Sequence, residues 1–102
     1  MKEMKLDYEA LPYGAMVWWE KCEDAFSYSI LLCIVDDDGA SHEICYITKD
    51  RNTTYHSFVD LGINRNGYTV KVQAENREGD VICEHMVSFR VSGIVTVRQR
   101  PY

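Results

Sequence analysis

The sequence lacks the features that would place it in a membrane or on nucleic acid. Its longest wholly apolar run is only a few residues, far below the roughly 18 that a membrane-spanning helix needs. Residues 1–7 begin with charge and contain no apolar stretch, so they do not resemble a signal peptide. The 11 basic residues are mostly scattered among 16 acidic ones, and the net charge is -5. Because binding to phosphates depends on clustered Lys and Arg, we expect no nucleic-acid binding. Because the apolar runs are short, we also expect no membrane insertion.

Motifs for catalysis and for metal binding are also missing. The four cysteines show no C-x-x-C spacing, and Cys83 and His85 have no second pair of ligands nearby in sequence, so we expect no metal. No segment has the spacing of a nucleophile elbow, a metalloprotease helix or a phosphate-binding loop. Asp36 to Asp38 lacks the spaced ligands of a calcium loop and is interpreted as a solvated hairpin. We therefore expect a non-catalytic protein without cofactors.

Apolar residues are present in the amount that one folded domain requires. The chain has 102 residues, of which 46% are hydrophobic and 26% charged, a composition that is neither disordered nor membranous. A domain of this size buries roughly two-thirds of the surface that its unfolded chain exposes. One hydrophobic core is therefore enough to stabilise the whole chain as a single domain, and no internal domain boundary is expected.

Alternation of apolar and polar residues is the main structural signal. From Tyr68 to Ala74 every second residue is apolar, which puts four apolar side chains on one face of a strand. Similar alternation occurs over residues 28–34 and 55–61, the latter through Tyr55, Ser57, Val59 and Leu61. Turn residues such as Asp38-Gly39 separate the segments. The expected strands are residues 5–8, 15–19, 28–34, 43–48, 55–61, 68–76 and one within 82–91.

The order of these segments resembles the fibronectin type III family. That family carries a buried Trp on its second strand, Tyr-x-Val on its third and a Leu before the Tyr of its sixth. Trp18-Trp19, Tyr28-Ser-Ile30, Leu61 and Tyr68 stand at these places. The link from Leu61 to Tyr68 departs from the pattern, because it is one residue longer and has Ile63 in place of Pro.

The resemblance covers residues 5–92 and implies an all-β fold. The expected architecture is a seven-stranded antiparallel β-sandwich of the fibronectin type III or immunoglobulin-like kind. Residues 1–92 would form this sandwich. Residues 93–102 would form a C-terminal extension, either an extra strand or a linker.

Only one of the two adjacent tryptophans can face the core. The set Ala15, Val17 and Trp19 is wholly apolar, whereas the alternative set that contains Trp18 ends in the carboxylate of Glu20. We therefore place Trp19 inside. Tyr68 is expected to form a tyrosine corner, in which the hydroxyl bonds to the backbone a few residues upstream. The predicted core comprises Trp19, Tyr28, Ile30, Leu32, Leu61, Tyr68, Val70, Val72 and Ala74.

The cysteines allow several interpretations. In a sandwich of this type the loops after the second and the sixth strand lie at the same end, so Cys22 and Cys83 can approach each other and form a disulfide. Cys33 and Cys45 lie on strands joined by a hairpin and are a second candidate pair. Buried thiols without any disulfide are an equally good interpretation, because Cys is a common small core residue.

The resemblance implies an interaction or adhesion-type module within a larger surface or secreted protein, with a cytoplasmic location as the alternative. Its partner would be a protein or a glycan, bound through loops at one end of the sandwich. A structural spacer that positions a neighbouring domain, for example a carbohydrate-active one, is the other function considered. The candidate binding loops contain Glu20, Lys21, Glu23, Asp24, Glu75, Asn76, Arg77 and Asp80.

The segment after the expected last strand is unusually β-prone. Ile94, Val95 and Val97 are too apolar for a typical flexible linker. An unpaired strand invites backbone pairing, so residues 93–98 are expected either to form a homodimer contact or to pair within the chain.

Overall fold

The computed structural model describes the backbone of residues 2–91 and the side chains of residues 4–91, and within these bounds the secondary structure is all β. None of the described residues forms a helix that could cross a membrane. The strands are β1 (Lys2–Glu3), β2 (Leu6–Leu11), β3 (Gly14–Trp19), β4 (Ser27–Val35), β5 (Ser41–Asp50), β6 (Tyr55–Phe58), β7 (Tyr68–Glu75) and β8 (Val81–Phe89).

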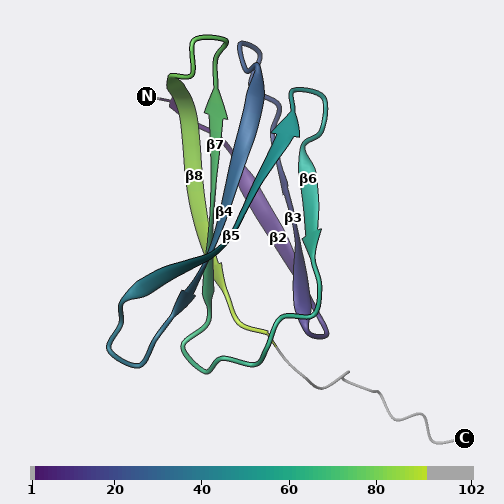
Figure 1. Cartoon of the computed structure of the whole chain (residues 1–102). Helices are drawn as coiled ribbons and strands as arrows, with labels where there is room; N and C mark the ends of the chain where they lie inside the picture. The colour runs from purple at the N-terminus through teal and green to yellow at the C-terminus, as the bar shows by residue number, and fades with distance from the viewer. Residues whose placement is uncertain (1, 92–102) are drawn as a thin grey trace, which may run out of the picture.

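Seven of these strands form two antiparallel sheets that pack on a shared core (Figure 1). The smaller sheet has the order β2-β3-β6, and the larger has the order β8-β7-β4-β5. The two-residue β1 adds to the larger sheet in parallel with β8. This is the arrangement of a β-sandwich. Its N-terminal segment contributes to both sheets, because the chain crosses from β1 to β2 through Met4 and Lys5.

The alternating residues of β4 and β7 form the centre of the core. Their pairing register aligns Ile30 with Val72 and Leu32 with Val70, so the apolar side chains of the two strands share one face. The side chains of β4 and β7 on this face, Tyr28, Ile30, Leu32, Tyr68, Val70, Val72 and Ala74, are at most 3% exposed. Burial of each large apolar side chain contributes about 1.5–3 kcal/mol.

Trp19 is the buried member of the tryptophan pair. It is 4% exposed, whereas Trp18 is 38% exposed on the opposite face of β3. Ala15 and Val17 lie on the same face as Trp19 and are fully buried. The indole of Trp19 meets the ring of Tyr28 edge-on, with centroids 5.5 Å apart, and so joins the two sheets.

The expected face of the fifth strand is wrong. The observed strand β6 ends at Phe58, and its pairing with β3 puts His56 opposite Val17 and Phe58 opposite the buried Ala15. Phe58 is therefore the buried residue, while Val59 is 65% exposed. Leu61 lies outside any strand and is only half-buried against the core. The chain leaves the sheet after Phe58, where Asp60 has a positive φ of 58°.

Stability should decrease as the pH falls, in part through His56. Burial lowers the pKa of its imidazole, and the charge of Lys49 acts in the same direction. Protonation thus favours the unfolded chain, so this contribution is present above the unfolded pKa of about 6.5 and is lost as the pH falls through the folded pKa. Urea midpoints measured from about pH 7.5 to 5 should fall less for His56→Gln than for the unmodified protein. Equal slopes would contradict this prediction.

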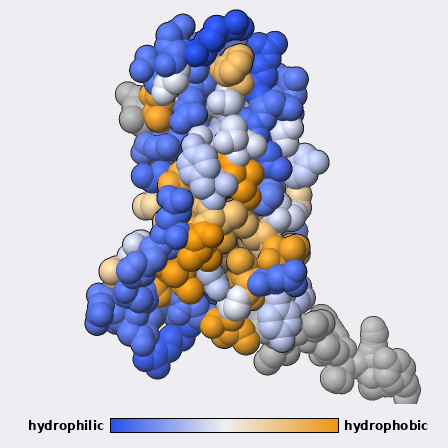
Figure 2. Space-filling view, viewed as in Figure 1, coloured by the Kyte–Doolittle hydropathy of each residue, from blue (hydrophilic) through white to orange (hydrophobic). Residues whose placement is uncertain are grey.

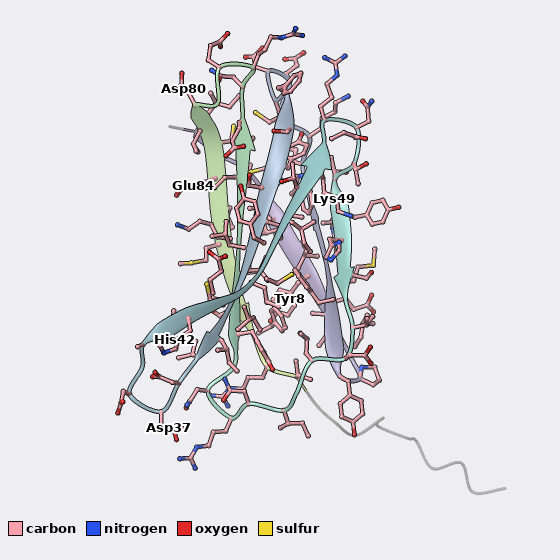
Figure 3. The ribbon with its side chains drawn as sticks, viewed as in Figure 1. Tyr8, Asp37, His42, Lys49, Asp80 and Glu84 are labelled. Atoms are coloured by element: carbon pink, nitrogen blue, oxygen red, sulfur yellow. The ribbon has the colours of Figure 1, made fainter. Side chains whose placement is uncertain are left out.

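The turns of the β4–β5 and β7–β8 hairpins lie at opposite ends of the molecule. Figure 3 labels His42 and Asp37 at one end and Asp80 at the other. In the β4–β5 hairpin Asp36 accepts hydrogen bonds from the amides of Asp38 and Ala40, both at 2.9 Å. Its carboxylate also lies 2.6 Å from His42 Nε2. These contacts lower the pKa of the Asp36 carboxyl, and the hydrogen bond with His42 has the largest effect. The acidic run therefore has a structural explanation.

Tyr68 forms the expected tyrosine corner, since its hydroxyl donates a hydrogen bond to the carbonyl oxygen of Gly62. Removing the hydroxyl in Tyr68→Phe should lower the free energy of unfolding by about 1 kcal/mol, because the link between β6 and β7 loses its anchor. Tyr55→Phe is the control, since Tyr55 is 55% exposed and should change little. Chemical denaturation compares the two variants, and equal stability would show that the corner contributes nothing.

The side of the sandwich at β5 and β6 is only partly covered. These strands are the last of their sheets, and inward residues of β5 such as Cys45 and Ile47 are half-buried. Figure 2 shows apolar side chains gathered over the middle and lower part of this face, with hydrophilic side chains at the upper end and on the projecting β4–β5 hairpin. The proposed contact through residues 93–98 lies outside the described residues.

Candidate functional site

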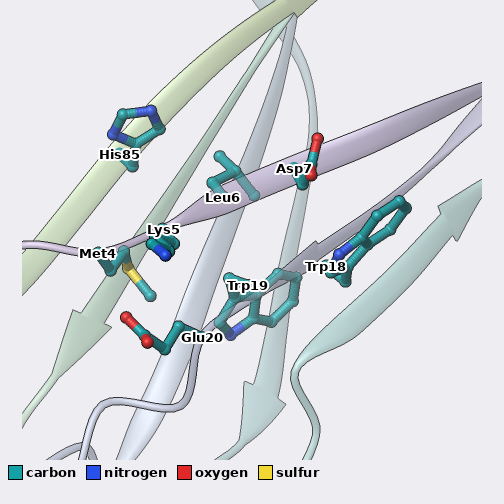
Figure 4. Close-up of a pocket in the computed structure, with 8 residues that line it drawn as sticks. All are labelled: Met4, Lys5, Leu6, Asp7, Trp18, Trp19, Glu20 and His85. Carbon is teal, nitrogen blue, oxygen red and sulfur yellow. The ribbon is translucent and has the colours of Figure 1, made fainter.

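A hollow of about 590 Å³ opens where the N-terminal crossover passes the end of β3 (Figure 4). It is formed by three segments that are distant in sequence: the crossover and the start of β2, the end of β3, and the middle of β8. Its walls are the side chains of Met4, Lys5, Leu6, Asp7, Trp18, Trp19, Glu20 and His85. A hollow of this size is within the range of about 300–1,000 Å³ that is usual for ligand pockets.

The floor of the pocket is apolar and ordered by the core. Met4 and Trp19 are each 4% exposed and Leu6 is 9% exposed. The pairing of Leu6 with Trp19 sets these two side chains beside each other. Trp18 stands on the outer face, opposite Asp7 of β2 and Tyr55 of β6, and remains 38% exposed. The site therefore offers one accessible indole next to a rigid apolar surface.

The indole nitrogen of Trp19 is a special feature of this floor. It is buried and makes no hydrogen bond to any residue that the structure describes. In Figure 4 this nitrogen lies on the side of the ring that faces Glu20. A buried donor without a partner costs about 1–3 kcal/mol. An acceptor atom that reached this nitrogen, from water or from a ligand, would be stabilised by the full hydrogen bond.

Ionisable side chains surround the apolar floor. Lys5, Asp7 and Glu20 are exposed, and His85 of β8 is half-buried. The rim thus combines two carboxylates with an ammonium group and an imidazole. No group of three or more potential metal ligands occurs among the described residues. The arrangement can pair with charges of either sign at the edge of a bound segment, while the floor takes an apolar group.

The structure brings the two predicted binding loops together at one end of the sandwich. The Phe26 amide donates to the Glu75 carbonyl at 2.7 Å, and the Arg77 guanidinium lies 5.2 Å from the centre of the Phe26 ring. The loop residues Glu20, Lys21, Glu23, Asp24, Arg77 and Asp80 are exposed, and Glu75 and Asn76 are half-buried. Only Glu20 also lines the pocket.

Asn76 has a structural role in its turn. Its side-chain oxygen accepts hydrogen bonds from the Glu78 amide at 3.1 Å and the Asp80 amide at 2.9 Å. Gly79 completes the turn with a φ of 88°. The side-chain oxygen of Asn76 therefore holds the β7–β8 turn, and Arg77 and Asp80 remain the accessible charges there.

The structure distinguishes between the two candidate cysteine pairs. The Sγ atoms of Cys22 and Cys83 lie 2.9 Å apart, across the gap between the β3–β4 loop and β8. Cys33 and Cys45, in contrast, are not opposite each other. A register shift in β4 pairs Cys45 with Leu32 and Cys33 with Glu43, so the two thiols lie on opposite faces of the sheet. The idea that Cys33 and Cys45 form a pair is therefore wrong.

No protein-family model matches this chain, and the search of curated proteins also finds no match.

The pocket was not predicted from the sequence, apart from Glu20 as a loop residue and Trp19 as a core residue. Its other walls come from segments with no shared motif. The one available signal was the pair Trp18-Trp19, since strand alternation requires that one of two adjacent tryptophans faces outward. Trp is also enriched among the residues that contribute most to protein–protein binding.

Proposed function

We propose that this chain is a non-catalytic interaction module of the fibronectin type III kind that binds another protein at the Trp18–Trp19 pocket. Three features support the family assignment: the three-plus-four strand arrangement, the buried Trp19 on β3 and the tyrosine corner at Tyr68. The observation that carries the binding proposal is the hollow of about 590 Å³, with its apolar floor and ionisable rim. Turnover in a broad hydrolase screen would contradict the non-catalytic part.

The proposed occupant is an extended segment of a partner protein that inserts an apolar side chain. β2 is the last strand of the smaller sheet, so its outer edge carries backbone groups that no strand of that sheet pairs. The pocket lies at the start of this strand, beside Leu6 and Asp7. A segment that added to the edge of β2 would place alternate side chains toward the pocket, as in other cases of strand addition. The charged rim would then favour charged residues next to the inserted apolar residue of the partner.

A random peptide library displayed on phage tests this proposal, with the purified domain as the bait. Peptides that bind should carry a large apolar residue, and their affinity should fall by about 30-fold for Trp18→Ala, the roughly 2 kcal/mol typical of a Trp anchor. Ile44→Ala is the matched control, because Ile44 is 50% exposed on β5, away from the pocket. That variant should bind normally.

Two results would argue against this function. Peptides that bind equally well to Trp18→Ala would show that another surface is the site. If no peptide is enriched, the spacer function is favoured, in which the domain only positions its neighbours. Circular dichroism of both variants checks that each is folded, which we expect because both side chains are exposed.

A further inference from the structure

We propose that Cys22 and Cys83 are a redox pair that forms an intramolecular disulfide by exchange with a small-molecule disulfide such as oxidised glutathione. The two residues are 61 positions apart in the sequence, yet their Sγ atoms lie 2.9 Å apart. A disulfide bond is about 2.05 Å long, so the sulfur atoms need to approach by less than about 1 Å. The fold thus delivers both thiols to one point.

The backbone on both sides holds this geometry. Cys83 lies within β8, where it pairs with Ala74 of β7, and it is 4% exposed. Cys22 lies in the β3–β4 loop, and its amide donates to the hydroxyl of Tyr28 at 2.9 Å. Its carbonyl accepts from the Ala25 amide at 3.0 Å. These bonds fix Cys22 to Tyr28 of β4 and within its own loop, so the thiol is held beside Cys83 before any covalent bond exists. This lowers the entropy that bond formation would otherwise cost.

The difference in exposure assigns the order of the chemical steps. Cys22 is half-buried and is the more accessible thiol, so its thiolate attacks one sulfur of oxidised glutathione. The glutathione S–S bond breaks, one glutathione leaves and takes up a proton, and a mixed disulfide remains on Cys22. Cys83 then loses its proton and attacks Cys22 Sγ, which releases the second glutathione. Two protein thiols are oxidised, and one glutathione disulfide is reduced to two thiols.

The bond would connect two walls of the pocket. Glu20 lies two residues before Cys22, and His85 lies two residues after Cys83, and both line the hollow. Oxidation would therefore hold the β3–β4 loop against β8 at the rim of the site. This consequence rests on the proposed function, whereas the formation of the bond does not.

Incubation of the full chain in an oxidising glutathione buffer tests the pair. The product should lose two hydrogen atoms by intact mass, and peptide mapping should join Cys22 to Cys83. Its melting temperature should rise by about 10 °C or more over the reduced form, because the bond closes a long loop in the unfolded chain. The double variant Cys33→Ser with Cys45→Ser should behave in the same way, and Cys22→Ser should show neither change.

Three outcomes would overturn the proposal or its consequence. If Cys22 and Cys83 both remain open to alkylation in that buffer, no redox pair exists. If mapping joins other cysteines, the assignment is wrong. Amide hydrogen exchange separates the effect on the pocket: oxidation should slow exchange over residues 20–25, and an oxidised protein with unchanged exchange there would leave the bond intact but refute its effect on the rim.

Discussion

Trp19→Ala should lower the free energy of unfolding by about 3–5 kcal/mol, the usual cost of replacing a buried Trp by Ala. The ring is 4% exposed and joins the two sheets through its contact with Tyr28. Its removal would leave a cavity between the two sheets, next to Leu6 and Tyr28. Because small domains have only about 5–15 kcal/mol of stability, the variant should be partly unfolded at 37 °C. Urea denaturation followed by far-ultraviolet circular dichroism measures the change.

Trp18→Ala is the matched control for this experiment. The two tryptophans are adjacent in sequence and both variants remove the same side chain, but Trp18 is 38% exposed. Its replacement should cost less than about 1 kcal/mol. If the two variants lose the same stability, or if Trp18→Ala loses more, the assignment of the inner face of β3 is incorrect.

Gly14→Ala should be the second severe substitution, with a loss of about 3 kcal/mol or more. Gly14 begins β3, and a Cβ added there would overlap the carbonyl oxygen of Phe58 in the neighbouring strand. The Cβ has a position fixed by the backbone of residue 14, and the atom it meets is a backbone oxygen, so neither can rotate away as the end of a long side chain would. Relief requires β6 to move from β3, which also displaces the buried Phe58. Thermal denaturation should show a melting temperature lower by about 10 °C or more.

Gly62→Ala is the control for the glycine effect itself. A Cβ at Gly62 would have only the Tyr68 hydroxyl near it, at 3.9 Å, and the residue is exposed. Ala also restricts the unfolded chain more than Gly does, so the change in stability should be small. A similar loss in both variants would indicate a general requirement for flexibility rather than a clash at Gly14.

The central strands were predictable because their side chains face the core and the outer surface in regular alternation. Tyr28, Ile30 and Leu32 in β4 alternate with residues of the outer face, and Val70 and Val72 do the same in β7. Such alternation depends on nearest neighbours along the chain, which the sequence contains directly. The register between β4 and β7 then follows, because a slip by one residue would turn every apolar side chain outward.

The face of β6 was not predictable by the same reasoning. Residues 55–61 contain apolar side chains at both odd and even positions, namely Tyr55, Phe58, Val59 and Leu61. The pairing of Phe58 with Ala15 of β3 selects Phe58 for the core, and the chain then turns at Asp60. A short edge strand has too few residues for its pattern to decide the face, so the contact with β3 decides it.

The sequence alone determined the all-β class, the central strands and the inward position of Trp19, because each depends on patterns within one segment. The corner at Tyr68 was expected from the resemblance to fibronectin type III domains. Only the tertiary structure decided which residues make the pocket and which cysteines meet. Met4, Trp18 and His85 line one hollow, and Cys22 and Cys83 lie 2.9 Å apart, although these residues come from separate strands and loops. Such contacts depend on how the N-terminal crossover and the β3–β4 loop are placed against β8. That placement is set by packing between the sheets, which no local pattern encodes.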